Sequence, residues 1–115
     1  MKSYKYCFIL VLASMSFGPV YAQKTAQAEI RGKVAERHSG EMIPFANLVL
    51  FAQGDTIALA GSVSDFDGLY SIKIEARGYY SLQCTFTGFA KVIVDSILLE
   101  PGKIYQQNIT LDEES

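Results

Sequence analysis

Histidine and cysteine, which often build catalytic and metal sites, are scarce in this sequence. Its 115 residues include one histidine, His38, and two cysteines, Cys7 and Cys84. One histidine cannot build a His-rich zinc site, and Cys84 would be its only sulfur companion. The sequence also lacks a Gly-x-Ser-x-Gly nucleophile elbow and a phosphate loop of the Walker type. These absences predict a protein that is not an enzyme, with no catalytic, cofactor-binding or metal-binding residues.

Basic residues are also few. Beyond residue 22 the chain carries eight Lys or Arg against twelve Asp or Glu. It shows neither a basic stripe for nucleic acid nor a polybasic patch for anionic lipid. We expect a mildly acidic surface and no nucleic-acid partner.

Residues 1–22 show the three-part pattern of a secretory signal peptide. Two lysines precede the apolar stretch 7–15, which is too short to span a bilayer as a helix. Val20 and Ala22 are the small residues at positions −3 and −1 of a cleavage site. We expect cleavage after Ala22, a flexible lead-in over 23–27, and no membrane span in the mature chain. The expected location is the periplasm, the outer membrane or the cell exterior.

Only one of the two cysteines is expected to remain in the mature chain. Cys7 lies inside the signal peptide, so Cys84 would be alone in the mature chain and no intramolecular disulfide could form. Cys7 begins the apolar stretch, whereas a lipid-attachment cysteine follows small residues at its end, so no lipid anchor is expected. Cys84 shares a strand face with Leu82 and Phe86, which favours a core position over a reactive thiol.

Apolar and polar residues alternate with a period of two through most of the remaining chain. No segment shows a sustained helical period, and turn signals recur about every ten residues. The pattern predicts one all-β domain over 28–111, a seven-stranded antiparallel β-sandwich, followed by an acidic tail over 112–115. The expected strands are 28–34, 45–52, 57–64, 69–76, 79–86, 90–99 and 104–111.

The alternation also predicts which side chains point inward. Tyr79 should point outward because it neighbours the inward Tyr80, and a bulge is expected near Asp95 and Ser96. Residues 45–52 are apolar on both faces, so alternation cannot orient them, and there we favour Ala46, Leu48 and Leu50 as inward. The other expected inward residues are Ala28, Ile30, Gly32, Val34, Tyr70, Ile72, Ile74, Ala76, Tyr80, Leu82, Cys84, Phe86, Tyr105, Ile109 and Leu111.

The stretch SDFDGLY, residues 64–70, could open a calcium loop or form a tight turn. An EF-hand loop that starts at Asp65 would need a glutamate at its twelfth position, which is Ala76. The pattern therefore favours a turn in which Asp65 and Asp67 bond their own backbone and Gly68 supplies a positive φ.

Five segments in this order resemble the carboxypeptidase regulatory-like domain, a transthyretin-like (prealbumin-like) β-sandwich. The segments are IRGKV (30–34), SGEMIPFANLVL (39–50), GSVSDFDGLYSIKI (61–74), GYYSLQCTFTGF (78–89) and LEPGKIYQQNITL (99–111). The resemblance implies a non-catalytic accessory module, of a kind that precedes TonB-dependent outer-membrane receptors in many Bacteroidetes. It also implies structural roles for Gly32, Gly40, Pro44, Asp65, Gly68, Tyr70, Ile72, Gly88 and Phe89.

Two kinds of partner stay open at this point. The first is another envelope protein, or a second copy of the chain, bound through a sheet edge. The second is a polysaccharide that stacks on outward aromatic residues, with Gln83 or Gln106 beside them. The chain is expected to be either a free-standing module or the product of a truncated receptor gene.

Overall fold

A computed structural model describes residues 26–75 and 77–114 of the chain. The expected signal peptide over 1–22, most of the lead-in over 23–27, and Ala76 lie outside the described residues. Within the described part, all the regular structure is β-strand, and no helix is long and apolar enough to cross a membrane.

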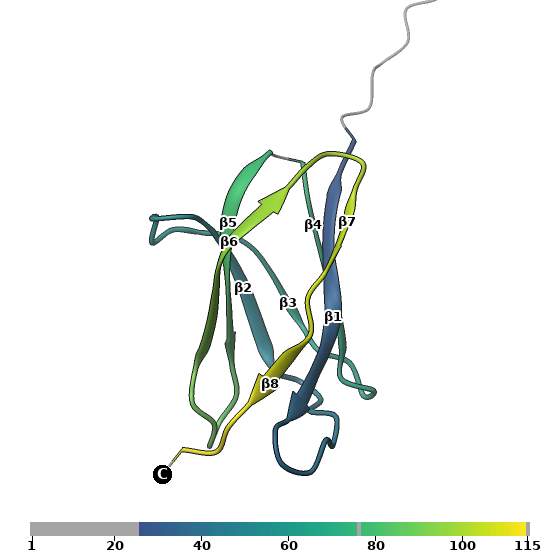
Figure 1. Cartoon of the computed structure of the whole chain (residues 1–115), viewed down its shortest axis with the longest axis vertical. Helices are drawn as coiled ribbons and strands as arrows, with labels where there is room; N and C mark the ends of the chain where they lie inside the picture. Colours follow the sequence, from purple (N-terminus) through teal and green to yellow (C-terminus); the bar gives the residue numbers. More distant parts are fainter. Residues whose placement is uncertain (1–25, 76, 115) are drawn as a thin grey trace, which may run out of the picture.

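Eight strands form two sheets that pack face to face (Figure 1). The first sheet has the order β4-β1-β7, with β8 also paired to β1, and the second has the order β3-β2-β5-β6. This architecture confirms the predicted all-β sandwich. The strands are β1 (Ala28–Glu36), β2 (Asn47–Ala52), β3 (Ala58–Val63), β4 (Leu69–Ile74), β5 (Gly78–Thr85), β6 (Val92–Leu99), β7 (Ile104–Gln106) and β8 (Ile109–Leu111).

The last predicted strand is divided, so that there are eight strands rather than seven. Gln107 lies between β7 and β8, where its N–H donates to the Arg31 carbonyl over 2.8 Å and its carbonyl accepts from the Tyr70 hydroxyl. A Cβ on Gly32 would lie 1.9 Å from the Gln107 oxygen. Because Gly32 has no side chain, the backbone at Gln107 can approach β1 closely, and this approach divides the last strand into β7 and β8.

The sandwich is also not antiparallel throughout, which corrects the prediction. β1 pairs with β7 and with β8 in parallel, and the other pairs are antiparallel. The turn over 100–103 carries the chain from β6 in one sheet to β7 in the other. A tight hairpin must join antiparallel neighbours, but a connection between sheets carries no such constraint.

The core lies between the sheets, and alternation predicted most of it. Ile74, Phe86 and Tyr105 are only partly buried against it, and the exposed Tyr79 faces outward as predicted. The predicted bulge is confirmed, since the β5–β6 register shifts opposite Asp95 and Ser96. The buried apolar residues are Ala28, Ile30, Val34, Ile43, Ala46, Leu48, Leu50, Tyr70, Ile72, Tyr80, Leu82, Cys84, Ile97, Leu99, Ile109 and Leu111.

Candidate interaction site

The β3 strand forms one edge of the second sheet, and β4 of the first sheet lies beside it without pairing. Within residues 26–75 and 77–114 it pairs with β2 alone. Its sequence, ALAGSV, contains no charged residue, and Leu59 and Val63 are about half exposed. One register shift interrupts its pairing near Leu59, after which Ala60–Val63 pair with β2 in regular order. Unpaired backbone groups on such a strand can accept another strand.

The other edge strands are blunted. β6 carries Asp95 and is bulged at Ser96, which has a φ of 59°. β4 carries Lys73, while β7 and β8 have three residues each. Charges, bulges and short length all discourage strand addition, so β3 is the edge best suited to receive a partner strand.

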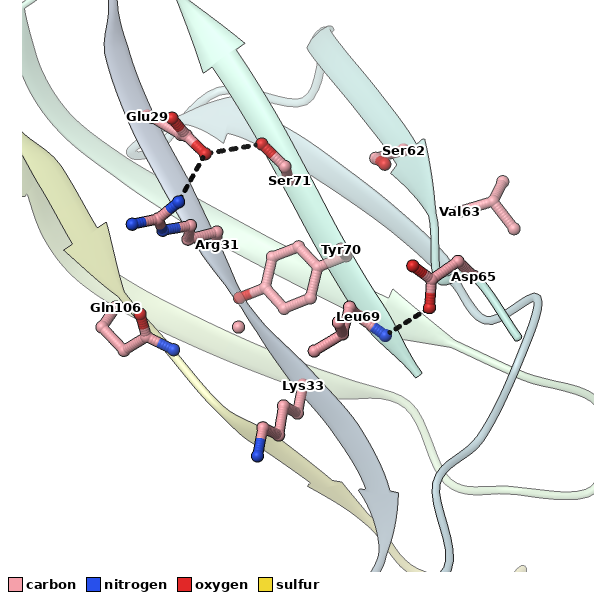
Figure 2. A pocket seen from close by; sticks show the side chains of 11 residues that line it. Glu29, Arg31, Lys33, Ser62, Val63, Asp65, Leu69, Tyr70, Ser71 and Gln106 are labelled. Carbon is pink, nitrogen blue, oxygen red and sulfur yellow. Dashed lines mark hydrogen bonds and ion pairs between the residues drawn. The ribbon is translucent and has the colours of Figure 1, made fainter. Parts of the chain in front are cut away.

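A hollow of about 580 Å³ lies beside the second half of β3. Figure 2 shows Ser62 and Val63 on one side of it, with β4 and β1 opposite. This hollow leaves space along the β3 edge. Its remaining lining residues are Glu29, Arg31, Gly32, Lys33, Asp65, Leu69, Tyr70, Ser71 and Gln106.

The β1 wall of this hollow is mixed in charge. The Glu29 carboxylate accepts a hydrogen bond from the Ser71 hydroxyl over 2.9 Å and lies 3.8 Å from the Arg31 guanidinium (Figure 2). This pair partly neutralises itself, and because Arg31 is exposed it contributes little to stability.

The buried Ser64, directly after the C-terminal end of β3, fixes a corner of the backbone that also includes residues 43–46. Its hydroxyl donates to the Ile43 carbonyl over 2.7 Å and accepts from the Ala46 N–H over 2.8 Å. Two backbone bonds, Phe45 N–H to the Ser64 carbonyl and Ser64 N–H to the Ala46 carbonyl, complete the corner. These four bonds start β2 at Asn47 rather than at residue 45, where the sequence placed it.

Phe45 is held in this corner with a strained backbone and an exposed ring. Its φ is 63°, in the left-handed region that aromatic residues rarely adopt. The ring is 52% exposed and lies edge-on to Phe66, which is 81% exposed, with centroids 5.1 Å apart. Strain that the surrounding structure imposes on an exposed side chain is typical of functional sites.

The turn that carries Phe66 is the one predicted from SDFDGLY. The Asp65 carboxylate accepts from the N–H groups of Asp67 and Leu69 over 2.9 and 3.0 Å, and Gly68 has a φ of 77°. The turn and its roles for Asp65 and Gly68 are confirmed. The prediction was wrong in giving Asp67 a similar capping role, because the Asp65 carboxylate alone makes both side-chain bonds.

The residues considered for chemistry neither line the hollow nor belong to the Phe45–Phe66 pair. Cys84 is buried, as predicted, and burial raises the pKa of its thiol to about 11. His38 is exposed in the turn after β1, as predicted. Beside it, two hydrogen bonds from Ser39 hold the pKa of the Glu36 carboxyl below its usual value. Among the described residues, no three His, Cys, Asp or Glu side chains gather to hold a metal ion.

The exposed aromatic pair was not predicted, although the sequence contains a signal for it. Phe66 stands between Asp65 and Asp67 in a tight turn. A large apolar residue at the tip of a polar turn has no inward strand face to occupy. The position of Phe66 at the tip of a turn therefore indicates that its ring is exposed.

Comparison with family profiles decides the classification. The profile of the carboxypeptidase regulatory-like domain matches residues 29–112. The chain belongs to this family. The resemblance drawn from the sequence is therefore confirmed. No curated protein sequence matches the chain.

Solved structures share the fold of this carboxypeptidase regulatory-like domain at low identity. The TIE protein of Bacillus anthracis is 15% identical over 76% of the chain, with a TM-score of 0.59. A minor pilin of Streptococcus agalactiae is 14% identical over 78%, with a TM-score of 0.54. Hydroxyquinol 1,2-dioxygenase of Pseudomonas putida is 9% identical over 93%, with a TM-score of 0.58. The chain covers 17%, 46% and 71% of these proteins in turn.

Proposed function

We propose that the protein is an exported, non-catalytic module that binds another envelope protein by accepting an extended strand at β3. The observation that carries the proposal is the contrast among the sheet edges. β3 alone combines six residues, no charge and an adjoining hollow. Strand addition would give affinity through backbone hydrogen bonds and specificity through alternate side chains.

The expected location and partner class belong to the same proposal. A signal peptide over 1–22, with cleavage after Ala22, would place the module in the periplasm or outside the cell. The family resemblance makes a TonB-dependent outer-membrane receptor the first partner to test. The mass of the mature protein tests the cleavage site, since cleavage after Ala22 leaves Gln23 as the first residue.

A non-catalytic role is supported by the separation of the reactive groups. The raised pKa of Cys84 keeps the thiol protonated near neutral pH, and the thiolate is the nucleophilic form. His38 is exposed in the turn after β1, whereas Cys84 is buried in the core. A catalytic pair needs its nucleophile and base within hydrogen-bond reach.

Site-specific photo-crosslinking in living cells tests the proposal. A benzoylphenylalanine is placed at Leu59 on β3 or, as the matched control, at Ile93 on β6. The two side chains are 49% and 51% exposed. We expect one discrete crosslinked protein from position 59, identified by mass spectrometry, and none from position 93. Crosslinks from position 93 alone, or from neither position, would overturn the proposal.

Saccharide binding is a second candidate, favoured by a separate groove. A hollow of about 430 Å³ on the outer face of the second sheet places Phe51 with Ser81, Gln83 and Asp95. A ring face beside an amide and a carboxylate is a combination that can stack on and hydrogen-bond a sugar. Calorimetric titration with envelope polysaccharide tests it, because Phe51→Ala should abolish any heat of binding.

The structure does not favour the aromatic arrangement first expected for sugar binding. That expectation needed coplanar outward rings with Gln83 or Gln106 beside them. Phe45 and Phe66 are inclined at 77° to each other. Gln83 lies on β5 and Gln106 on β7, in different sheets. We therefore rank strand addition above saccharide binding.

A further inference from the structure

We infer that the segment accepted by β3 carries a lysine or arginine at the end that meets the Phe45–Phe66 pair. This inference rests on the proposed strand addition and adds the chemistry of the partner to it. Two independent features point to a cation: the charges around β3 and the geometry of the aromatic pair. The same charges also argue against self-pairing.

The charge pattern around β3 is one-sided. From Ser39 to Ile72 the sequence contains no Lys or Arg, and it contains four acidic residues. Asp55 lies three residues before β3, while Asp65 and Asp67 follow its end. The two cations that line the hollow beside β3, Arg31 and Lys33, belong to β1, and Arg31 is paired with Glu29 (Figure 2). Complementarity therefore favours a partner segment with a basic end.

The aromatic pair gives this cation a defined place to bind. Phe66 lies between two aspartates in sequence, and its ring is 81% exposed. Phe45 meets it at an interplanar angle of 77°, so one ring presents its edge and the other its face. Ring faces attract ammonium and guanidinium groups, and the neighbouring carboxylates add to that attraction.

The same charges disfavour a second copy of this chain as the occupant. In an antiparallel β3–β3 pair, the Asp55 end of one copy would lie beside the Asp65 and Asp67 end of the other. Like charges brought together at an interface oppose association. A β3–β3 pair would place aspartates side by side at both ends of the paired strands. A basic segment from a different protein would instead neutralise the aspartates that it meets.

Selection from a random peptide library tests the inference directly on the purified protein. Twelve-residue peptides displayed on phage are selected against the wild type, Phe66→Ala and Tyr79→Ala. Tyr79→Ala is the matched control because Tyr79 is another exposed aromatic ring, on β5. The best peptide is then synthesised with its terminal Lys or Arg, with norleucine in that place, and with N-methylated backbone amides.

We expect Lys or Arg at one end of peptides selected by the wild type and by Tyr79→Ala, but not by Phe66→Ala. Norleucine should weaken binding to the wild type about 5-fold or more, with little change for Phe66→Ala. Equal enrichment of basic ends by Phe66→Ala, or no enrichment, would overturn the inference and leave strand addition standing. Peptides whose binding ignores N-methylation, or no selected peptides, would overturn strand addition as well.

Discussion

The two edges of the second sheet differ although they belong to one layer and border the same core. β6 carries a charge and a bulge in its middle, and Ser96 there has a positive φ. β3 is built from small and apolar residues, and its irregularity lies near its start. Natural sheets usually protect their edges. This contrast between the two edges is the basis of the proposal that β3 receives a partner strand.

The strained residues of the two edges differ in the same way. The left-handed residue at β6 is Ser96, which lies in a bulge and turns the edge away from pairing. The left-handed residue near β3 is Phe45, whose strain holds a large ring in solvent. A strained residue therefore accompanies a bulge at one edge and an exposed aromatic ring near the other.

The largest effect is expected from Ser64→Ala, which removes the support of the β3 end. The hydroxyl makes two buried hydrogen bonds, so we expect a loss of about 2–4 kcal/mol in the free energy of unfolding. Urea denaturation measures the loss, and Ser96→Ala on the β6 edge is the control. A loss below about 1 kcal/mol for Ser64→Ala would show that the corner does not depend on Ser64.

The sequence predicts the interior of the sandwich well, because a period of two fixes which residues of a strand face the core. Ile30, Ile72 and Leu82 were placed correctly by this rule. The turn at Asp65 and Gly68 was also predictable, because its side-chain and φ requirements are local.

The candidate site depends on contacts that sequence periodicity does not encode. The exposed Phe45 depends on Ser64, which is remote in sequence, and the break between β7 and β8 depends on Gly32. The open edge of β3 depends on strand order across the sheet. Each of these features requires a tertiary neighbour that no local pattern specifies.

Two buried ionisable side chains in the core, Cys84 and Tyr70, should make the fold less stable at high pH. Burial raises the pKa of Cys84 to about 11, and it also raises the pKa of Tyr70 above its usual value. The native protein then keeps protons that the unfolded chain loses, so stability is complete below about pH 9 and falls as pH rises. Each group contributes a slope of about 1.4 kcal/mol per pH unit, which begins at about pH 9 for Cys84 and at about pH 10 for Tyr70.

Urea denaturation between pH 8 and 11 checks this prediction. Cys84→Ala should lower stability at pH 8 because it opens space in the core, but it should also flatten the decline above pH 9. An unchanged slope in Cys84→Ala would contradict the assigned cause.

A charge introduced at the β3 edge should weaken partner binding, whereas the same change at β6 should not. Leu59→Lys places an ammonium on the accepting strand, and we expect binding of a selected peptide to weaken about 10-fold, or about 1.4 kcal/mol. Ile93→Lys is the matched control at nearly equal exposure. Fluorescence anisotropy measures both, and equal losses would remove the distinction between the edges.

The smallest effect is expected from relieving strain at each edge. Ser96→Gly and Phe45→Gly should each raise the free energy of unfolding by up to about 1 kcal/mol, because glycine adopts a positive φ freely. Only Phe45→Gly should weaken peptide binding. If Ser96→Gly weakens binding as much, the strain at Phe45 has no special role.

Hydrogen–deuterium exchange on the crosslinked partner complex tests the central claim most directly. The account predicts that amides of β3 over 58–63 exchange more slowly in the complex, while those of β6 over 92–99 keep the rate of the free protein. Protection of β6 with unchanged exchange in β3 would contradict the account.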